Sequence, residues 1–125
     1  MEVYEIHVQT EFSAAHFLRG YPGNCANTHG HNWTIDVFVR CEKLDEMGIA
    51  IDFRLIKQAL NDLLKDFDHH LLNDLPIFQN MNPTSENIAK HFYLELGKRI
   101  NRENIKVSKV KASESSKTGA SYWEE

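Results

Sequence analysis

The sequence has few cysteines and no long apolar run, and each shortage excludes a class of protein. Its two cysteines, Cys25 and Cys41, are too few for a disulfide framework. No apolar run approaches the ~20 residues that a membrane-spanning helix needs. The first twelve residues, MEVYEIHVQTEF, lack the basic start and apolar stretch of a secretory signal. We therefore expect a reduced, cytoplasmic protein with no membrane partner.

An excess of charge of one sign is also missing. The formal net charge is −4, and acidic and basic residues are mixed along the chain. Such a chain produces no field that attracts nucleic acid, so a nucleic-acid partner is not expected. The length of 125 residues and the apolar fraction of 42% suit one core, and residues 1–125 should form one domain. Histidine, in contrast, is abundant, with seven copies.

Hydrophobic periodicity predicts strands near both ends of the chain and helices between them. Asp52 can cap a first helix, and Pro83-Thr84 opens a second, with Thr84 as its cap. The stretch 68–83 should be irregular. The order β-β-α-α-β-β predicts an α+β domain, in which two helices cover one face of a four-stranded antiparallel sheet. The predicted strands are residues 2–16, 31–41, 104–112 and 121–123.

A four-stranded open sheet leaves two edges with unpaired backbone groups. Small domains often hide such edges by joining subunits. We therefore expect a homo-oligomer.

Three histidines form a candidate metal site. His29-Gly30-His31 is an H-x-H pair, and in a strand residues i and i+2 point to the same face. His16 ends the preceding strand, which should run antiparallel beside the pair. Three imidazoles suit Zn²⁺, and three protein ligands leave a coordination position open, as in catalytic sites. The alternative is three separate histidines at a strand end, each satisfied by hydrogen bonds.

Cys25 lies four residues before His29 in a loop rich in glycine and asparagine. A thiol near a cation has a lowered pKa and can act as a general base. Two alternatives stay open for Cys25. It could be a small buried residue, an interpretation that suits Cys41 in its strand better. It could also be a fourth zinc ligand that closes the site.

Two further groups are candidates for proton transfer or substrate binding. In Asp68-His69 a carboxylate could fix the tautomer of an imidazole and raise its basicity. Adjacent side chains often diverge, so a solvated helix end is the alternative. Glu114 lies at the end of the third predicted strand, just past residue 112, where its two oxygens could accept paired N–H donors of a planar ligand. The alternative for Glu114 is a surface carboxylate.

Together these segments resemble the tetrahydropterin synthase family, the enzymes of the tunnelling fold (T-fold). They occur in the family's order and extend over nearly the whole chain. The spacing of Cys25 from His29, the short length and the P-T-S-E segment are most similar to the bacterial 6-carboxy-tetrahydropterin synthase branch. The sister branch, 6-pyruvoyl-tetrahydropterin synthase, has most of the same residues. The matching segments are Phe12-Ser-Ala-Ala-His16, Cys25-Ala-Asn-Thr-His29-Gly-His31, Asp68-His-His-Leu-Leu-Asn73, Pro83-Thr-Ser-Glu-Asn87 and Glu114.

The resemblance implies a role for each matching residue. It makes the three histidines zinc ligands, Cys25 the base that abstracts a proton, and Asp68 with His69 a proton relay. Glu114 matches the residue that anchors the pterin and is also a catalytic candidate as a member of the relay, and Thr84 is a further candidate for holding the pterin ring. The chain carries Trp123 where some relatives have a basic residue, which leaves the triphosphate contacts open. The candidates for those contacts are Arg19, Arg54 and Lys117.

The resemblance also implies a reaction and an assembly. The substrate would be 7,8-dihydroneopterin triphosphate, and loss of triphosphate and acetaldehyde would give 6-carboxy-5,6,7,8-tetrahydropterin for queuosine synthesis. Family members form trimers whose sheets join into a barrel, and two trimers stack, with active sites between subunits. One alternative is 6-pyruvoyl-tetrahydropterin synthase activity on the same substrate. Another is a non-catalytic zinc-binding module with a closed site.

Overall fold

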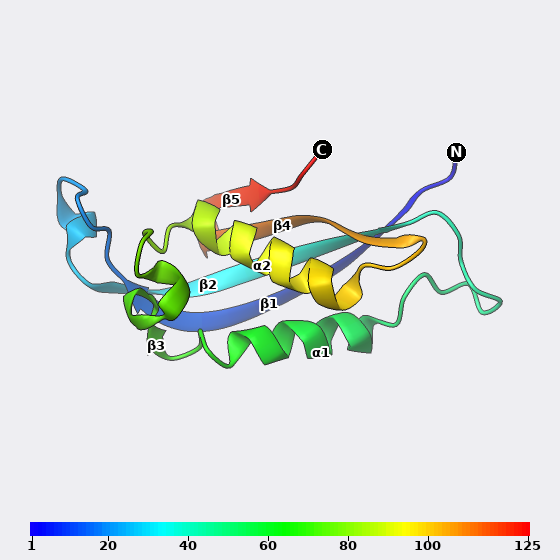
Figure 1. Cartoon of the computed structure of the whole chain (residues 1–125), viewed down its shortest axis with the longest axis horizontal. Coiled ribbons are helices and arrows are strands. Elements are labelled where there is room, and N and C mark those ends of the chain that lie inside the picture. Colours follow the sequence, from blue (N-terminus) through cyan, green and yellow to red (C-terminus); the bar gives the residue numbers. More distant parts are fainter.

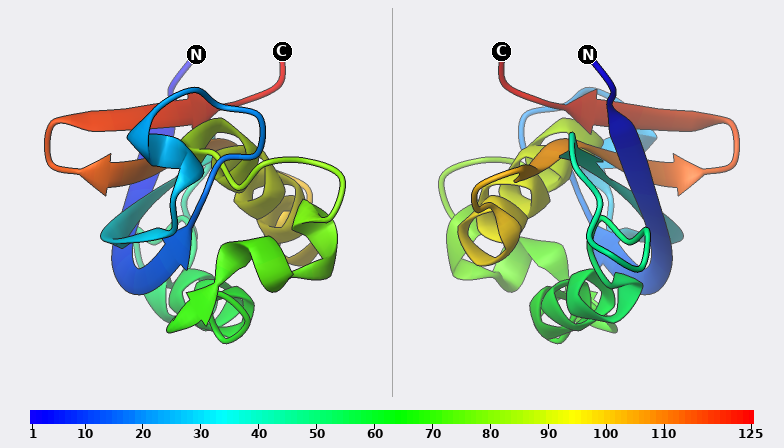
Figure 2. Two further views of the ribbon diagram at one scale, coloured as in Figure 1. Left: turned by 90° about the vertical axis from the view of Figure 1, so that its left-hand side faces the viewer. Right: turned by 90° about the vertical axis from the view of Figure 1, so that its right-hand side faces the viewer.

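The computed structural model describes residues 1–125, which form two layers (Figure 1). One layer is a five-stranded sheet, and both α-helices lie against the same face of it, as the end-on views of Figure 2 show. The elements are β1 (Tyr4–His16), η1 (Asn24–Ala26), β2 (His29–Cys41), α1 (Phe53–Leu64), β3 (His70–Leu71), η2 (Leu72–Asp74), η3 (Pro76–Phe78), α2 (Ser85–Ile100), β4 (Ile105–Ser115) and β5 (Thr118–Tyr122).

The α+β class and the order of the main elements are confirmed, but the sheet has one strand more than predicted. Its order is β3-β1-β2-β4-β5. The added strand, β3, is two residues long and pairs in parallel with Ala14 and Ala15 of β1. Two residues show no periodicity, so the sequence pattern could not predict it. Two short 3-10 helices, η2 and η3, also lie within the stretch expected to be irregular.

The antiparallel register of β1 and β2 positions the histidines. His16 is directly opposite His29, and Ala14 is opposite His31. The strand β2 begins at His29, two residues earlier than predicted, so the H-x-H pair lies inside the sheet. The expectation that His16 faces this pair from a neighbouring antiparallel strand is therefore confirmed.

Both helix caps form as predicted. The Asp52 carboxylate accepts from the backbone N–H of Arg54, and the Thr84 hydroxyl accepts from that of Asn87. Phe53, an apolar marker of the first helix, is the first residue of α1, is 54% exposed and does not join the core. The core is one cluster of 26 buried residues between the sheet and the helices.

His91 of α2 should make stability depend on pH. Its ring stacks on Phe67, with 5.6 Å between ring centroids, and burial lowers its pKa below the ordinary 6.5. As pH falls below about 6.5, the unfolded chain takes up a proton that the folded chain resists. We expect the free energy of unfolding to fall from pH 7 to pH 5.5, and to fall less steeply in His91→Gln. Urea unfolding of the two metal-free proteins at several pH values measures this. An equal change of unfolding free energy with pH in both proteins would contradict the prediction.

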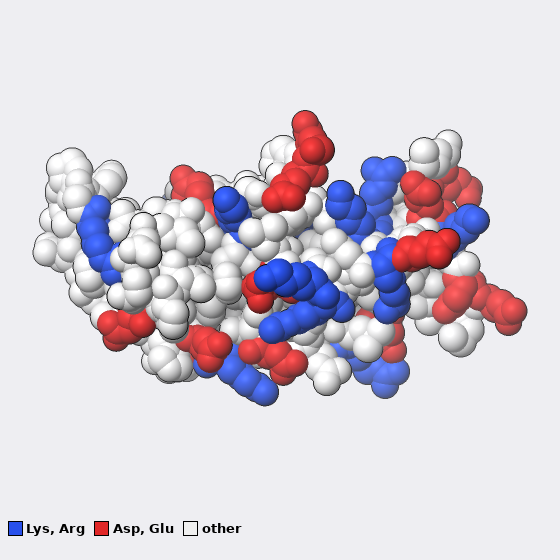
Figure 3. Space-filling view, in the orientation of Figure 1, with Lys and Arg blue, Asp and Glu red and all other residues white.

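Charges of both signs are interspersed on the face of the molecule that carries the helices (Figure 3). Lys and Arg side chains gather over α2, but Asp and Glu side chains lie among them, and the end of the molecule at the left of the view carries few charges. This face therefore has no large basic patch. Neither α-helix is both long enough and apolar enough to cross a membrane.

Candidate metal centre

The three histidines predicted as ligands meet at one end of the sheet, on the face that carries the helices. The centroids of their rings lie 4.6 Å apart for His16 and His29, 4.9 Å for His29 and His31, and 5.2 Å for His16 and His31. One nitrogen from each ring lies within 4.8 Å of the other two. The fully buried Trp33 lies edge-on to His16 and His31, with 4.9 and 5.4 Å between ring centroids. The alternative of three unconnected histidines therefore does not hold.

Backbone carbonyls orient two of these rings. Nδ1 of His16 donates to the Pro83 carbonyl at 2.8 Å, and Nδ1 of His29 donates to the Asn27 carbonyl at 2.7 Å. Because Nδ1 carries the proton in each ring, Nε2 keeps a lone pair. Such a bond from the second ring nitrogen is typical of histidines that bind metals.

Two nitrogens in this cluster are buried without any hydrogen-bond partner. They are Nε2 of His16 and Nε2 of His31. A buried polar atom without a partner costs about 1–3 kcal/mol, so native structures rarely leave one unused. A cation bound by these lone pairs would remove the cost. The donor set, three imidazoles, fits Zn²⁺ with one coordination position open. The cluster could therefore hold a metal ion.

The surroundings of His16 also favour the neutral form of its ring. Only 1% of His16 is exposed, and this burial lowers the pKa of its imidazole. The neighbouring Glu114 opposes that shift, and the other two histidines add to it. A metal binds the neutral form of histidine, so a lowered pKa reduces competition from protons near neutral pH.

Glu114 lies beside the cluster rather than out on the surface. Its two carboxylate oxygens are 3.7 Å from Nε2 of His16 and 3.6 Å from Nε2 of His31, and its side chain is 33% exposed. It comes from β4, the strand next to β2. Glu114 is therefore both close to the histidines and accessible to a ligand, as an anchor for a planar N–H edge requires.

Cys25 does not belong to the cluster. It lies in the short helix η1, is half-buried, and is not among the residues whose ligand atoms converge. The Cys25 carbonyl accepts from the backbone N–H of Leu18, which ties this loop to the chain that follows β1. The fourth-ligand interpretation of Cys25 gains no support from this geometry. Cys41 is buried, as expected for a small apolar residue in a strand.

Asp68 and His69 do form a pair. Oδ1 of Asp68 lies 3.0 Å from Nδ1 of His69 and accepts from the backbone N–H of Ser13 at 2.9 Å. That backbone hydrogen bond, helped by His69, lowers the pKa of Asp68. His69 has a φ of 60°, which an L-residue rarely adopts, and its backbone N–H donates to the Ser13 carbonyl. The two side chains therefore do not diverge, although both are exposed to solvent, His69 at 80% and Asp68 at 44%.

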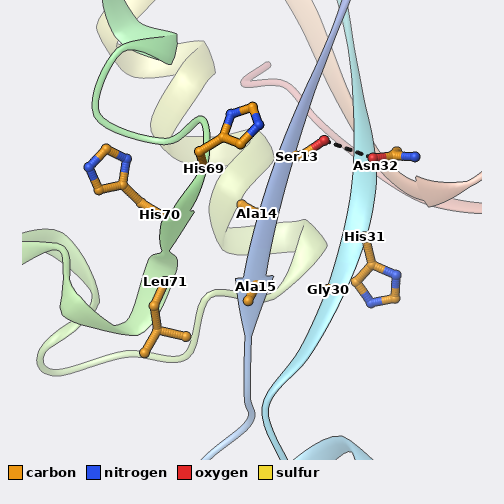
Figure 4. Close-up of a pocket in the computed structure, with 9 residues that line it drawn as sticks. All are labelled: Ser13, Ala14, Ala15, Gly30, His31, Asn32, His69, His70 and Leu71. Atoms are coloured by element: carbon orange, nitrogen blue, oxygen red, sulfur yellow. Dashed lines mark hydrogen bonds between the residues drawn. The ribbon is translucent and has the colours of Figure 1, made fainter.

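The pair nevertheless stands apart from the metal cluster within one chain. No hydrogen bond or ion pair joins His69 to the three histidines, and the His69 side chain is 80% exposed. His69 and His31 do line the same open hollow, about 560 Å³ in volume, over the edge of the sheet (Figure 4). Ser13 and Asn32, joined by a hydrogen bond of 2.8 Å, line the same hollow.

The remaining candidates divide into used and free groups. The Thr84 hydroxyl caps α2, next to the carbonyl that holds His16. Arg19 donates to three backbone carbonyls, and Arg54 pairs with Asp52 at the start of α1, so neither guanidinium is free. Lys117, in the turn between β4 and β5, is exposed and has no ion pair. Lys117 is therefore the one predicted triphosphate candidate whose charged group makes neither an ion pair nor a hydrogen bond to a carbonyl.

Sequence reasoning missed the contribution of Pro83, whose carbonyl orients His16. A backbone acceptor has no signature in a sequence, because every residue carries one. Asn73 was recognised only as part of a motif, although it is buried and binds the backbone of Phe17. A polar residue at a core position of an otherwise apolar run is the signal that could have revealed it.

Known proteins are similar to this chain in sequence and in fold. Residues 5–125 match the family described as 6-pyruvoyl tetrahydropterin synthase. The chain is 36% identical over 104 residues to a putative 6-carboxy-5,6,7,8-tetrahydropterin synthase of Archaeoglobus fulgidus, which covers 82% of this chain and 85% of that one. It is 34% identical over 95 residues to 6-carboxy-5,6,7,8-tetrahydropterin synthase of Bacillus subtilis, covering 72% of this chain and 63% of the other.

A solved structure agrees in fold over the whole chain. The 6-pyruvoyl tetrahydropterin synthase of Caenorhabditis elegans superposes with a TM-score of 0.87 at 26% sequence identity, covering 100% of this chain and 98% of that one. The T-fold expected from the sequence is therefore confirmed for the single chain. The chain belongs to the 6-pyruvoyl tetrahydropterin synthase family.

Proposed function

We propose that the protein is a zinc-dependent lyase that converts 7,8-dihydroneopterin triphosphate and one water molecule to 6-carboxy-5,6,7,8-tetrahydropterin, acetaldehyde and triphosphate. The observation that carries this proposal is the three-histidine cluster, with two buried, unpartnered nitrogens beside an accessible carboxylate. The names of relatives at 31–36% identity support the carboxy product. Such a product would serve queuosine synthesis, as the resemblance implies.

The residues of this chain would divide the work. His16, His29 and His31 would hold the ion, which when bound supplies Lewis-acid chemistry toward the substrate's side-chain hydroxyls. Glu114 would accept two N–H groups from the pyrimidinone edge of the pterin and so orient the ring.

Proton transfer would fall to the other two groups. Cys25, as the thiolate, would remove a proton from a side-chain carbon. Asp68 would hold His69 in one tautomer, so that its Nε2 could deliver or accept a proton at the opposite side of the substrate. Thr84 would line the pterin site, and Lys117 is our candidate for the triphosphate.

The site as proposed is complete only in an assembly. His69 is exposed and lies apart from the cluster in its own chain. By analogy with the family, we propose a homo-oligomer, either a trimer or a dimer of trimers, in which the sheets of neighbouring subunits join at their open edges into a barrel. Asp68 and His69 would then reach the histidines of a neighbouring subunit.

Product analysis tests the reaction. Purified protein loaded with zinc is incubated with 7,8-dihydroneopterin triphosphate, and the products are identified by mass spectrometry. We expect acetaldehyde and a carboxylated tetrahydropterin in equal amounts. A product that keeps a three-carbon diketo side chain would favour 6-pyruvoyl-tetrahydropterin synthase activity, the second candidate, which the likeness to the C. elegans enzyme supports. No turnover of any pterin by the loaded protein would instead favour a non-catalytic zinc-binding module.

Substitution of Glu114 tests the anchor. Glu114→Gln keeps the size of the side chain but turns one acceptor oxygen into a donor, which opposes the pterin N–H groups. We expect KM to rise about 10- to 100-fold, because a hydrogen bond to a charged group contributes roughly 1.5–3 kcal/mol. Steady-state kinetics with zinc analysis of the same samples checks this. Loss of zinc together with activity would contradict the anchor and make Glu114 a ligand.

A further inference from the structure

Two asparagine side chains hold the chain that leaves β1 just after His16. Asn73 accepts from the backbone N–H of Phe17 at 2.9 Å and donates to the Phe17 carbonyl at 3.0 Å. Asn82 makes the same two hydrogen bonds to the backbone of Arg19, two residues after Phe17, with distances of 2.8 and 3.0 Å. Each amide thus replaces the pairing that a neighbouring strand would give. We call each such pair of hydrogen bonds, from one side-chain amide to the N–H and C=O of one residue, an amide bracket. The two amide brackets join residues 17–19 to the segment between β3 and α2.

The side chain of Arg19, an exposed residue, contacts the same segment. Its guanidinium donates to the Phe78 carbonyl at 2.7 Å, to the Asn73 carbonyl at 3.3 Å and to the Met81 carbonyl at 3.4 Å. No carboxylate pairs with it. A guanidinium presents five donors in a rigid fork, so one side chain can hold several carbonyls in a fixed arrangement. Arg19 therefore fixes the course of residues 73–82.

The fixed segment ends at the histidine cluster. Pro83 follows Asn82 directly, and its buried carbonyl accepts from Nδ1 of His16. The position of this carbonyl determines which tautomer His16 adopts and where its Nε2 points. A displacement of residues 78–82 would release the ring, because the imidazole of His16 makes no other hydrogen bond.

We infer that Arg19 is a positioning residue for the metal centre, acting through Asn82 and the Pro83 carbonyl on His16. The inference rests on the proposed metal site and deepens it by naming a determinant of metal affinity. Changes that disturb the group behind a ligating histidine cost about 10- to 100-fold in metal affinity. Arg19 would act in this way without contacting the ion. Its guanidinium would bind backbone carbonyls rather than the triphosphate of the substrate.

Cobalt titration of the metal-free protein without substrate tests this inference. Arg19→Lys keeps the charge but loses the fork, and Arg99→Lys is the matched control. Arg99 also donates to a carbonyl, that of Ala59 on α1, and belongs to the last turn of α2. We expect Arg19→Lys to weaken Co²⁺ binding about tenfold or more, with an altered visible spectrum, and Arg99→Lys to match the unchanged chain.

A second pair of variants separates positioning from stability. Asn82→Ala removes the bracket on Arg19, and Asn104→Gly removes a similar amide bracket on Lys43 at the far end of the sheet. Glycine suits the φ of 71° at Asn104. We expect comparable losses in thermal midpoint from both metal-free variants, but weaker Co²⁺ binding from Asn82→Ala alone. Unchanged affinity in both Arg19→Lys and Asn82→Ala would overturn the inference and leave the metal site standing. Failure of the unchanged chain to bind Co²⁺ would overturn both.

Discussion

Replacement of His31 by alanine should abolish metal binding and reduce turnover to the level of the metal-free protein. His31 supplies one of only three converging imidazoles, and its buried Nε2 has no other partner. Two remaining ligands would hold the ion weakly and leave it without a fixed open position. The His31 side chain is 24% exposed, so its loss creates no deep cavity and the fold should persist.

Thermal unfolding with and without zinc provides a measurement that is independent of activity. A ligand that binds only the folded chain stabilises it by about 2.7 kcal/mol when its concentration is 100 times Kd. The unchanged protein should therefore unfold at a higher temperature with zinc than after treatment with a chelator. His31→Ala should unfold at one temperature in both conditions. After dialysis, metal analysis should give one ion per chain for the unchanged protein and none for His31→Ala.

His7→Ala is the matched control for this experiment. His7 belongs to β1, as His16 does, but it lies in the part of the strand away from the cluster and bonds to Asp36 at 2.7 Å. It should keep its metal, its response to zinc and its turnover. A zinc response in His31→Ala equal to that of the unchanged protein would show that the three imidazoles do not form the binding site.

The sequence predicted the fold well where the pattern is periodic and long. Alternation over β2 placed Trp33, Ile35 and Val37 on one buried face, and the structure shows all three fully buried. The same period of two implied that His29 and His31 share a face. Pairing with the preceding strand then brought His16 to them. Local periodicity and a single strand pairing therefore suffice to predict this cluster.

Other parts of the site depend on contacts that no local pattern encodes. The relation of Asp68 to His69 depends on a positive φ at His69 and on the backbone of Ser13, which is 55 residues away in the chain from Asp68. The three carbonyls around Arg19 come from a segment with no regular period. Arg19 consequently looked like a free cation in the sequence, although the fold uses its charge internally.

Cys25→Ala should lower kcat by about 10²–10⁴-fold, the usual contribution of general acid–base catalysis, while the protein keeps its zinc. The thiol is outside the set of converging ligand atoms, so its removal takes no donor from the ion. It is half-buried in a loop, and its loss should leave the thermal midpoint nearly unchanged. Steady-state kinetics, metal analysis and thermal unfolding on one preparation check the three expectations together.

Cys41→Ala is the control for the fall in kcat expected of Cys25→Ala, because it removes the other thiol of the chain. Cys41 is buried at the end of β2, where its Sγ lies 2.7 Å from the Lys43 carbonyl, and it is remote from the histidines. Its removal should cost stability through a small cavity but leave kcat unchanged. Retention of full kcat by Cys25→Ala would show that the thiol takes no part in the reaction and that another group is the base. Loss of zinc from Cys25→Ala alone would instead make Cys25 a fourth ligand and turn an open catalytic site into a closed structural one, because four protein donors leave zinc no position for a substrate.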